Sequence, residues 1–212
     1  MQSVWQELVT TVVHLLNQTA ANHLFDDVVV RYGEDGRYYH TLQHIQQMLT
    51  DVAPLKCEVE NWTAVQYAIW FHDVVYVPGA NDNEERSAAY TCDALDKMGI
   101  CQFTDQVEGM ILATKLQAAA VTDPDTQILL DADLATLGSP PHKYRQYAQA
   151  IRHEFTFVPL PDYCQGRIKI LSQFLQRPQI YYTERFYDKY ESQARKNLLH
   201  EISQLNNQRG LA

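Results

Sequence analysis

A histidine and an aspartate, His72 and Asp73, stand side by side at the end of a strongly apolar run. Burying such a pair beside apolar side chains costs free energy unless the two groups are paired or bind an ion. Imidazole nitrogen and carboxylate oxygen suit divalent ions such as Mn, Fe, Co, Ni and Mg. The pair therefore indicates either part of a metal site or an ordinary ion pair at the end of a helix.

A metal site needs further ligands, and two other segments offer them. His40 and His44 are one helical turn apart, which places them on the same face of a helix. Asp131 and Asp133 stand inside an apolar segment that ends at Leu134. One histidine and one aspartate from these two pairs would complete a ligand set drawn from three helices.

Helices must position these groups, because apolar residues recur along most of the chain at the spacing of an amphipathic helix. Glycines at positions 99 and 138 are expected to end two of the helices. The β-branched residues 28–30 are too few to build a sheet. The expected fold class is therefore all-α. The expected helices cover residues 2–18, 40–51, 60–75, 81–98, 104–116, 124–137, 141–157, 161–176 and 183–206.

The composition of the chain disfavours several classes of function. A length of 212 residues with 46% hydrophobic and 20% charged residues suits one globular domain. The formal net charge is −9, and Lys and Arg do not cluster beyond pairs, so a nucleic-acid polymer is not an expected partner. The N-terminus has no basic segment, and no apolar run reaches membrane-spanning length, so neither a signal peptide nor a membrane partner is expected. The four cysteines form no C-x-x-C pair, and reduced thiols fit a cytoplasmic location.

Four ordered segments resemble the HD superfamily of metal-dependent phosphohydrolases, in particular a bacterial branch known mainly as predicted HD phosphohydrolases. They are residues 39–45 (YHTLQHI), 70–76 (WFHDVVY), 82–88 (DNEERSA) and 130–138 (LDADLATLG), and residues 191–198 (ESQARKNL) are also similar. The resemblance covers most of the chain. It implies one HD-type helical domain over residues 1–212, with a core at about 20–138 and additional C-terminal helices at about 139–212.

The resemblance also implies the ligands of the metal. On the matching positions, His44, His72, Asp73 and Asp133 are expected to bind one divalent ion, which would be Mn, Ni, Co, Fe or Mg. Asp131 would then orient a ligand or cap backbone groups. Relatives often carry a histidine shortly after the segment that matches residues 113–114, and this chain has none there. This departure favours a single ion over a dinuclear site.

The implied reaction is hydrolysis of a phosphate ester of a small molecule or nucleotide. Asp73 and Glu84 are expected to transfer protons as catalytic residues. His40, Lys115 and Arg86 are expected to bind the phosphoryl oxygens of the substrate. The expected partner is thus a small phosphorylated substrate. The aromatic residues near the C-terminus are expected to pack either in the core or at the contact of a homodimer; they are Tyr181, Tyr182, Phe186 and Tyr187.

Three other functions compete with this interpretation. A non-catalytic module that binds a metal or nucleotide as a sensor or regulator would keep the same ligands. Oxygen-dependent cleavage at a di-iron centre would need additional histidines, and residues 115–117 offer none. A purely structural helical scaffold is disfavoured by carboxylates within apolar helices.

Overall fold

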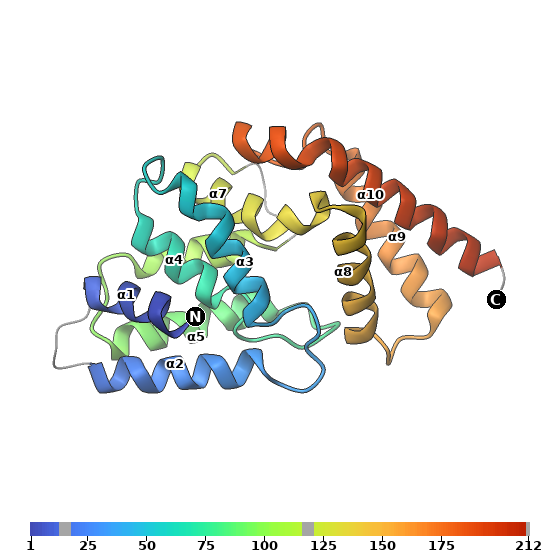
Figure 1. Ribbon diagram of the computed structural model, residues 1–212. Coiled ribbons are helices and arrows are strands. Elements are labelled where there is room, and N and C mark those ends of the chain that lie inside the picture. The colour runs from blue at the N-terminus through green and yellow to red at the C-terminus, as the bar shows by residue number, and fades with distance from the viewer. Residues whose placement is uncertain (13–17, 116–120, 211–212) are drawn as a thin grey trace. The chain divides into compact units, whose positions relative to one another are not determined.

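The computed structural model describes residues 1–12, 18–115 and 121–210, and every regular element in these residues is a helix (Figure 1). The expected all-α fold class is thus confirmed. Among the described residues, no helix combines the length and the apolar character needed to cross a membrane. The elements are α1 (Gln2–Val12), α2 (Gln18–Tyr32), α3 (Leu42–Val52), η2 (Ala53–Leu55), α4 (Trp62–Phe71), α5 (Asn83–Lys97), α6 (Thr104–Ala113), α7 (Pro124–Leu134), η3 (Ala135–Gly138), α8 (Pro141–Glu154), α9 (Leu160–Gln176) and α10 (Glu184–Gly210).

Contacts between residues divide the chain into two compact units, Met1–Leu130 and Asp131–Ala212. The division falls inside α7, so this single helix has residues in both units. The expected C-terminal extension begins later, at about residue 139. The organisation of the whole chain as one HD-type domain stays a prediction.

Helix α4 lies at the centre of the first unit. Its sequence, WTAVQYAIWF, is apolar on nearly every side, and seven of its ten residues are buried. Trp5 of α1 packs edge-on against Trp70 with ring centroids 5.2 Å apart, and its indole N–H donates to the carbonyl of Ala21 over 3.2 Å. Helices α3, α5 and α6 also contact α4. This aromatic core holds the C-terminal end of α4, from which His72 and Asp73 follow.

Most helix boundaries lie within a few residues of the expected positions, and α2 is the exception. Residues 28–30, too short for a strand, belong to this helix, with Val28 buried and Val30 exposed. Gly99 follows the end of α5 with a φ of 75°, the left-handed conformation that favours glycine, as expected. Residues 13–17 of the expected helix 2–18 and residue 116 of the helix 104–116 lie outside the described residues.

The second unit is organised around the long helix α10, which packs against α9 and η3. The side-chain amide of Asn197 donates to the carbonyls of Leu137 and Ser139, each over 2.8 Å. Gly138 lies so close to Tyr190 that a Cβ at this glycine would be 2.5 Å from the Cβ of the tyrosine. These contacts fix η3, and with it the end of α7, to the middle of α10.

Candidate metal centre

His72 follows α4 directly and is 1% exposed. Its backbone N–H still donates to the carbonyl of Ala68, so the residue is held as the cap of the helix. Its Nδ1 lies 3.0 Å from the carbonyl of Ile69, and its Nε2 lies 3.1 Å from Oδ2 of Asp73. A neutral imidazole has only one N–H. If that proton is on Nδ1 and is donated to the carbonyl of Ile69, the lone pair of Nε2 is left to serve as a ligand of a cation.

His44 lies in the first turn of α3, which begins where the side chain of Thr41 accepts from the N–H of Gln43. The residue is 6% exposed, and its ring packs on that of Tyr39 with centroids 4.8 Å apart. The rings of His44 and His72 are 5.4 Å apart between centroids. Two buried imidazoles from α3 and from the end of α4 therefore meet.

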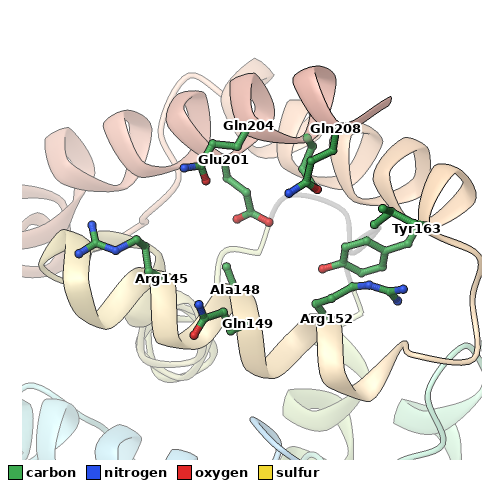
Figure 2. Close-up of a pocket in the computed structure, with 10 residues that line it drawn as sticks. Arg145, Ala148, Gln149, Arg152, Tyr163, Glu201, Gln204 and Gln208 are labelled. Atoms are coloured by element: carbon green, nitrogen blue, oxygen red, sulfur yellow. The ribbon is translucent and has the colours of Figure 1, made fainter. Parts of the chain in front are cut away.

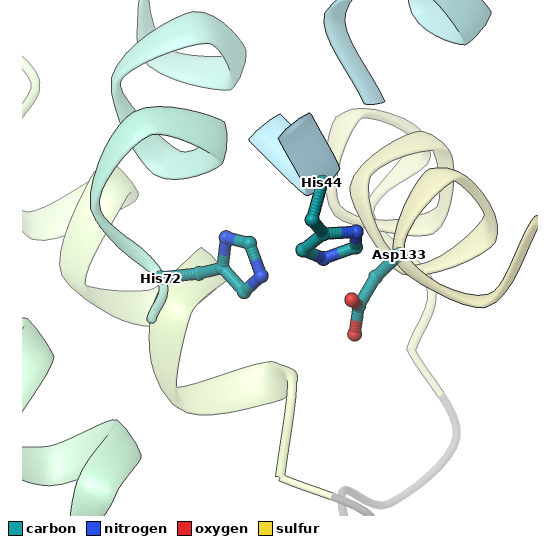
Figure 3. A group of neighbouring side chains, drawn as sticks. All are labelled: His44, His72 and Asp133. Atoms are coloured by element: carbon teal, nitrogen blue, oxygen red, sulfur yellow. The ribbon is translucent and has the colours of Figure 1, made fainter. Parts of the chain in front are cut away.

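Asp133 supplies a carboxylate to this pair of histidines. It lies near the end of α7, and Figure 3 shows its side chain beside those of His44 and His72. One ligand atom from each of the three residues lies within 4.8 Å of the others, so the group could hold a metal ion. His44, His72 and Asp133, expected as ligands from the sequence, are thus brought together.

Asp131 has a different environment, although it is only two residues earlier. Its carboxylate accepts from the backbone N–H groups of Tyr182 and Thr183, over 2.8 and 2.7 Å, and from the hydroxyl of Thr183 over 2.7 Å. Burial raises the pKa of Asp131 to about 6, against the opposing effect of these hydrogen bonds. The expectation that Asp131 caps backbone groups is borne out by these contacts.

Asp73 and His40 border the cluster. Asp73 Oδ2 is 3.1 Å from Nε2 of His72 and 3.9 Å from Nε2 of His40. The His40 ring stacks on Tyr76, with centroids 4.0 Å apart. Asp73 is not part of the group of His44, His72 and Asp133, but the contact with His72 places the carboxylate of Asp73 beside that group. Its role as a fourth ligand stays a prediction.

Arg37 positions the backbone around these residues and was not anticipated from the sequence. Its side chain is 2% exposed, and it donates to the carbonyls of Asp73 (2.7 Å), Val74 (3.1 Å) and His40 (3.2 Å). Glu34 pairs with the same guanidinium at 3.3 Å. The arginine thereby joins the loop before α3 to the loop after α4. One arginine in a polar loop gives no sequence signal of this role.

Two side chains of α5 hold the loop after α4 from the other side. Ser87 Oγ accepts from the N–H of Val75 and donates to its carbonyl, and the Asn83 amide does the same for Val77. Both side chains are buried. They lie four residues apart, on one face of α5. The segment of residues 82–88 therefore braces the loop after α4 through these two side chains.

The remaining expected site residues lie outside the three-residue group. Glu84 is half-buried in the first turn of α5. Arg86 makes an exposed ion pair with Asp82 at 3.9 Å. Lys115 makes an ion pair with Glu85, and its Nζ donates to the carbonyl of Asn81 over 2.8 Å. A phosphate-binding role for Lys115 would require it to exchange this carboxylate for the substrate, and it stays a prediction.

The site offers two imidazoles, one neighbouring carboxylate in the group and a second carboxylate beside it, in a partly buried setting. Such a donor set can bind a divalent ion and accept protons next to it. Comparisons with family models, with curated proteins and with solved structures give no match for this chain.

Proposed function

We propose that this protein is a metal-dependent phosphohydrolase of the HD type, which hydrolyses the phosphate ester of a small molecule or nucleotide. The observation that carries the proposal is the grouping of His44, His72 and Asp133 within 4.8 Å. The resemblance of four ordered segments to the HD superfamily supports it independently of that distance.

The donor set fits a divalent cation. The carbonyl beside Nδ1 of His72 favours a proton there, which leaves Nε2 as the lone-pair nitrogen of the neutral ring. A set of two imidazoles with carboxylates suits Mn, Fe, Co or Ni, and carboxylates also suit Mg. His44, His72 and Asp133 would hold the ion, with Asp73 as the expected fourth ligand. A divalent ion bound there would lower the pKa of bound water, toward about 7 in favourable sites.

Protein groups around the ion have defined tasks in this proposal. Asp73, beside both His72 and His40, accepts the proton of the attacking water. His40, held against Tyr76, donates to a phosphoryl oxygen of the substrate. Glu84, acting as a protonated acid, gives its proton to the leaving oxygen and is reprotonated from solvent. Arg86, at the start of α5, and Lys115, just after α6, contact the phosphate. Arg37 keeps the backbone of Asp73 and His40 in one arrangement.

The charge of the chain favours a small substrate. Residues 1–130 contain 18 Asp and Glu against 6 Lys and Arg, a net charge of −12. A long polyanion would be repelled by such a surface, whereas a single phosphate could be compensated locally by an ion. A cytoplasmic location and a homodimer remain parts of this proposal; Tyr182 and Tyr187, 38% and 39% exposed, are candidate dimer contacts.

Metal content and phosphatase activity test the proposal together. Protein purified without chelator should contain one divalent ion per chain by mass spectrometry. It should hydrolyse phosphomonoesters, including nucleoside monophosphates, with Mn, Ni, Co, Fe or Mg added. Asp133→Ala and His72→Ala should lose both the ion and the activity, because each removes a ligand. Asp26→Ala and His23→Ala, which change exposed residues of α2, serve as matched controls.

A non-catalytic sensor is the second candidate, since it would use the same ligands. Stoichiometric metal and saturable nucleotide binding without turnover would favour the sensor. Full activity in a folded Asp133→Ala variant would refute the metal-dependent mechanism.

A further inference from the structure

The second unit contains a cavity that has no part in the proposed reaction. It lies among α8, α9 and α10 and has a volume of about 600 Å³, within the range typical of small-molecule sites. Figure 2 shows side chains from the three helices around it. Those that carry the argument are Arg145 and Gln149 of α8, Tyr163 of α9, and Glu201, Gln204 and Gln208 of α10.

The wall of the cavity is held by a buried polar network. The Glu201 carboxylate, 6% exposed, accepts from Nε and Nη2 of Arg167 over 2.9 and 3.3 Å and from the hydroxyl of Tyr144 over 2.5 Å. The negative charge of Glu201, a lining residue, is therefore compensated by the guanidinium of Arg167, which is not part of the lining. Such satisfied networks are rigid, so the wall keeps its shape without a ligand.

The uncompensated charge at the cavity is positive. Among the described residues, Arg145 has no hydrogen bond or ion pair, and it is exposed at the rim. Arg152 is engaged differently: its guanidinium donates to the carbonyls of Phe155 and Val158 and lies 4.6 Å from the centre of the Tyr163 ring. Arg145 is thus the cation available to a ligand.

The charge of the second unit reinforces this local effect. Residues 131–212 contain 11 Lys and Arg against 8 Asp and Glu, a net charge of +3, in a chain whose total is −9. Of these bases, α8 carries Lys143, Arg145 and Arg152 and only one acid, Glu154. An anion is therefore favoured at this unit over the acidic first unit.

The rest of the lining fits the body of an organic molecule. Ala148, Leu160 and Leu205 supply apolar surface, and Tyr163, with Arg152 over its ring, completes the lining on the side of α9. The amides of Gln149 and Gln204 each offer donors and an acceptor at the edge of the cavity. A flat ring with polar edge groups can use both kinds of surface.

We propose that this cavity binds a small organic anion with a flat, polar-edged body, of the size of a nucleoside monophosphate. Arg145 binds the anionic group, the glutamine amides bind the edge of the body, and the apolar side chains cover its faces. The site is separate from the metal ligands and uses none of their residues.

Calorimetric titration in the presence of EDTA tests the proposal without metal-dependent turnover. The probes are AMP, UMP and 1-naphthyl phosphate, with adenosine and inorganic phosphate as fragments that lack the anion or the body. We expect saturable binding of at least one monophosphate, and binding of each fragment about tenfold weaker or more. Arg145→Met should weaken the affinity for the monophosphate by a similar factor and leave the affinity for adenosine unchanged. The matched control is Arg185→Met, an exposed arginine of α10 outside the cavity.

Substitutions that fill the cavity provide a second test, which does not depend on Arg145. Ala148→Trp in α8 and Gln204→Trp in α10 should each abolish binding of the monophosphate. The two substitutions are on different helices, so one folded variant is enough for the test if the other does not fold. Circular dichroism identifies the folded variants. The proposal is overturned if no probe binds the wild-type protein. It is equally overturned if binding survives both Arg145→Met and a folded cavity-filling variant.

Discussion

At the scale of single residues, the surroundings of two aspartates decide what each can do. Asp133 lies with His44 and His72, whereas Asp131 accepts three hydrogen bonds from residues 182 and 183. Both are carboxylates on one helix. Because they are two residues apart, their side chains leave the helix in nearly opposite directions, about 200° apart around its axis. Asp133 is therefore placed as a candidate ligand, and Asp131 joins α7 to the start of α10.

Asp131 should make stability depend on pH. Its folded-state pKa of about 6 lies above the ordinary value of 3.8, so the folded protein holds the proton more tightly than the unfolded chain. The stabilisation linked to this proton is fully present below about pH 4 and is lost as pH rises through about 6. Relative to Asp131→Asn, the wild-type free energy of unfolding should therefore fall between about pH 4.5 and about pH 7.5. Urea unfolding at several pH values measures this, and parallel profiles for the two proteins would contradict it.

Arg37 should matter both to stability and to the metal. Arg37→Met keeps most of the side-chain volume but leaves the carbonyls of His40, Asp73 and Val74 without their donor. We expect a loss of about 2 kcal/mol or more in the free energy of unfolding, because buried acceptors become unsatisfied. We also expect weaker metal binding, because Asp73 and His40 lose their common anchor. Equilibrium unfolding and metal titration check both effects, with Arg185→Met as the control; wild-type metal affinity in Arg37→Met would exclude the positioning role.

At the scale of elements, the site depends on how helices end. Helix α4 stops at Phe71, so His72 and Asp73 leave the helix and their side chains can face a common point. Asn83 and Ser87 on α5 then satisfy the backbone of residues 75 and 77. In the second unit, the short helix η3 ends at Gly138 against α10, which fixes the end of α7.

Two glycine substitutions test the packing of η3 on α10. In Gly138→Ala, the new Cβ would lie 2.5 to 2.8 Å from the Cβ, carbonyl oxygen and Cα of Tyr190, so backbone must move. We expect destabilisation of about 1–3 kcal/mol, as for other overpacked sites. The matched change Gly166→Ala in α9 meets nothing within 4 Å and should stabilise by up to about 1 kcal/mol through helix propensity. In thermal unfolding, the melting temperature should fall in Gly138→Ala and rise or stay the same in Gly166→Ala. Equal melting temperatures for the two variants would refute the close packing.

At the scale of the whole molecule, charge is distributed unevenly along the chain. Residues 1–130, which include the candidate metal ligands His44 and His72, have a net charge of −12. Residues 131–212, which include the proposed anion cavity, have a net charge of +3. The total of −9 repels anionic molecules at long range. Access of a phosphorylated substrate is therefore expected to depend on ionic strength.

Raising the salt concentration should increase kcat/KM for a dianionic phosphomonoester. Salt shortens the distance over which the acidic surface repels the substrate, from about 30 Å at 0.01 M to about 8 Å at 0.15 M. Steady-state kinetics over this range should show a larger increase for the dianionic monoester than for a monoanionic diester. A fall in kcat/KM with salt would mean that local basic groups outweigh the net charge in attracting the substrate.

The sequence by itself determined most of the helices and the few histidines and aspartates from which the candidate ligands come. Apolar spacing predicts α4 as a buried helix, and glycine at position 99 predicts the end of α5, because both depend on local chemistry. The types of His72 and Asp73, with the two flanking pairs of histidines and aspartates, indicate a metal site for the same reason, whereas the choice of His44 and Asp133 came from the family resemblance. Helix α2 was missed because three consecutive β-branched residues weaken the local helical signal, and burial against the rest of the unit overrides it.

Only the tertiary structure decided which groups meet. Residue type and spacing alone could not separate the capping role of Asp131 from the position of Asp133, because the bonding partners of Asp131 lie some 50 residues later. They gave no sign of Arg37, because that role comes from carbonyls 36 and 37 residues away. The cavity among α8, α9 and α10 was equally hidden. Hydrogen bonds and cavities formed between distant segments depend on packing, which has no local periodicity to reveal it.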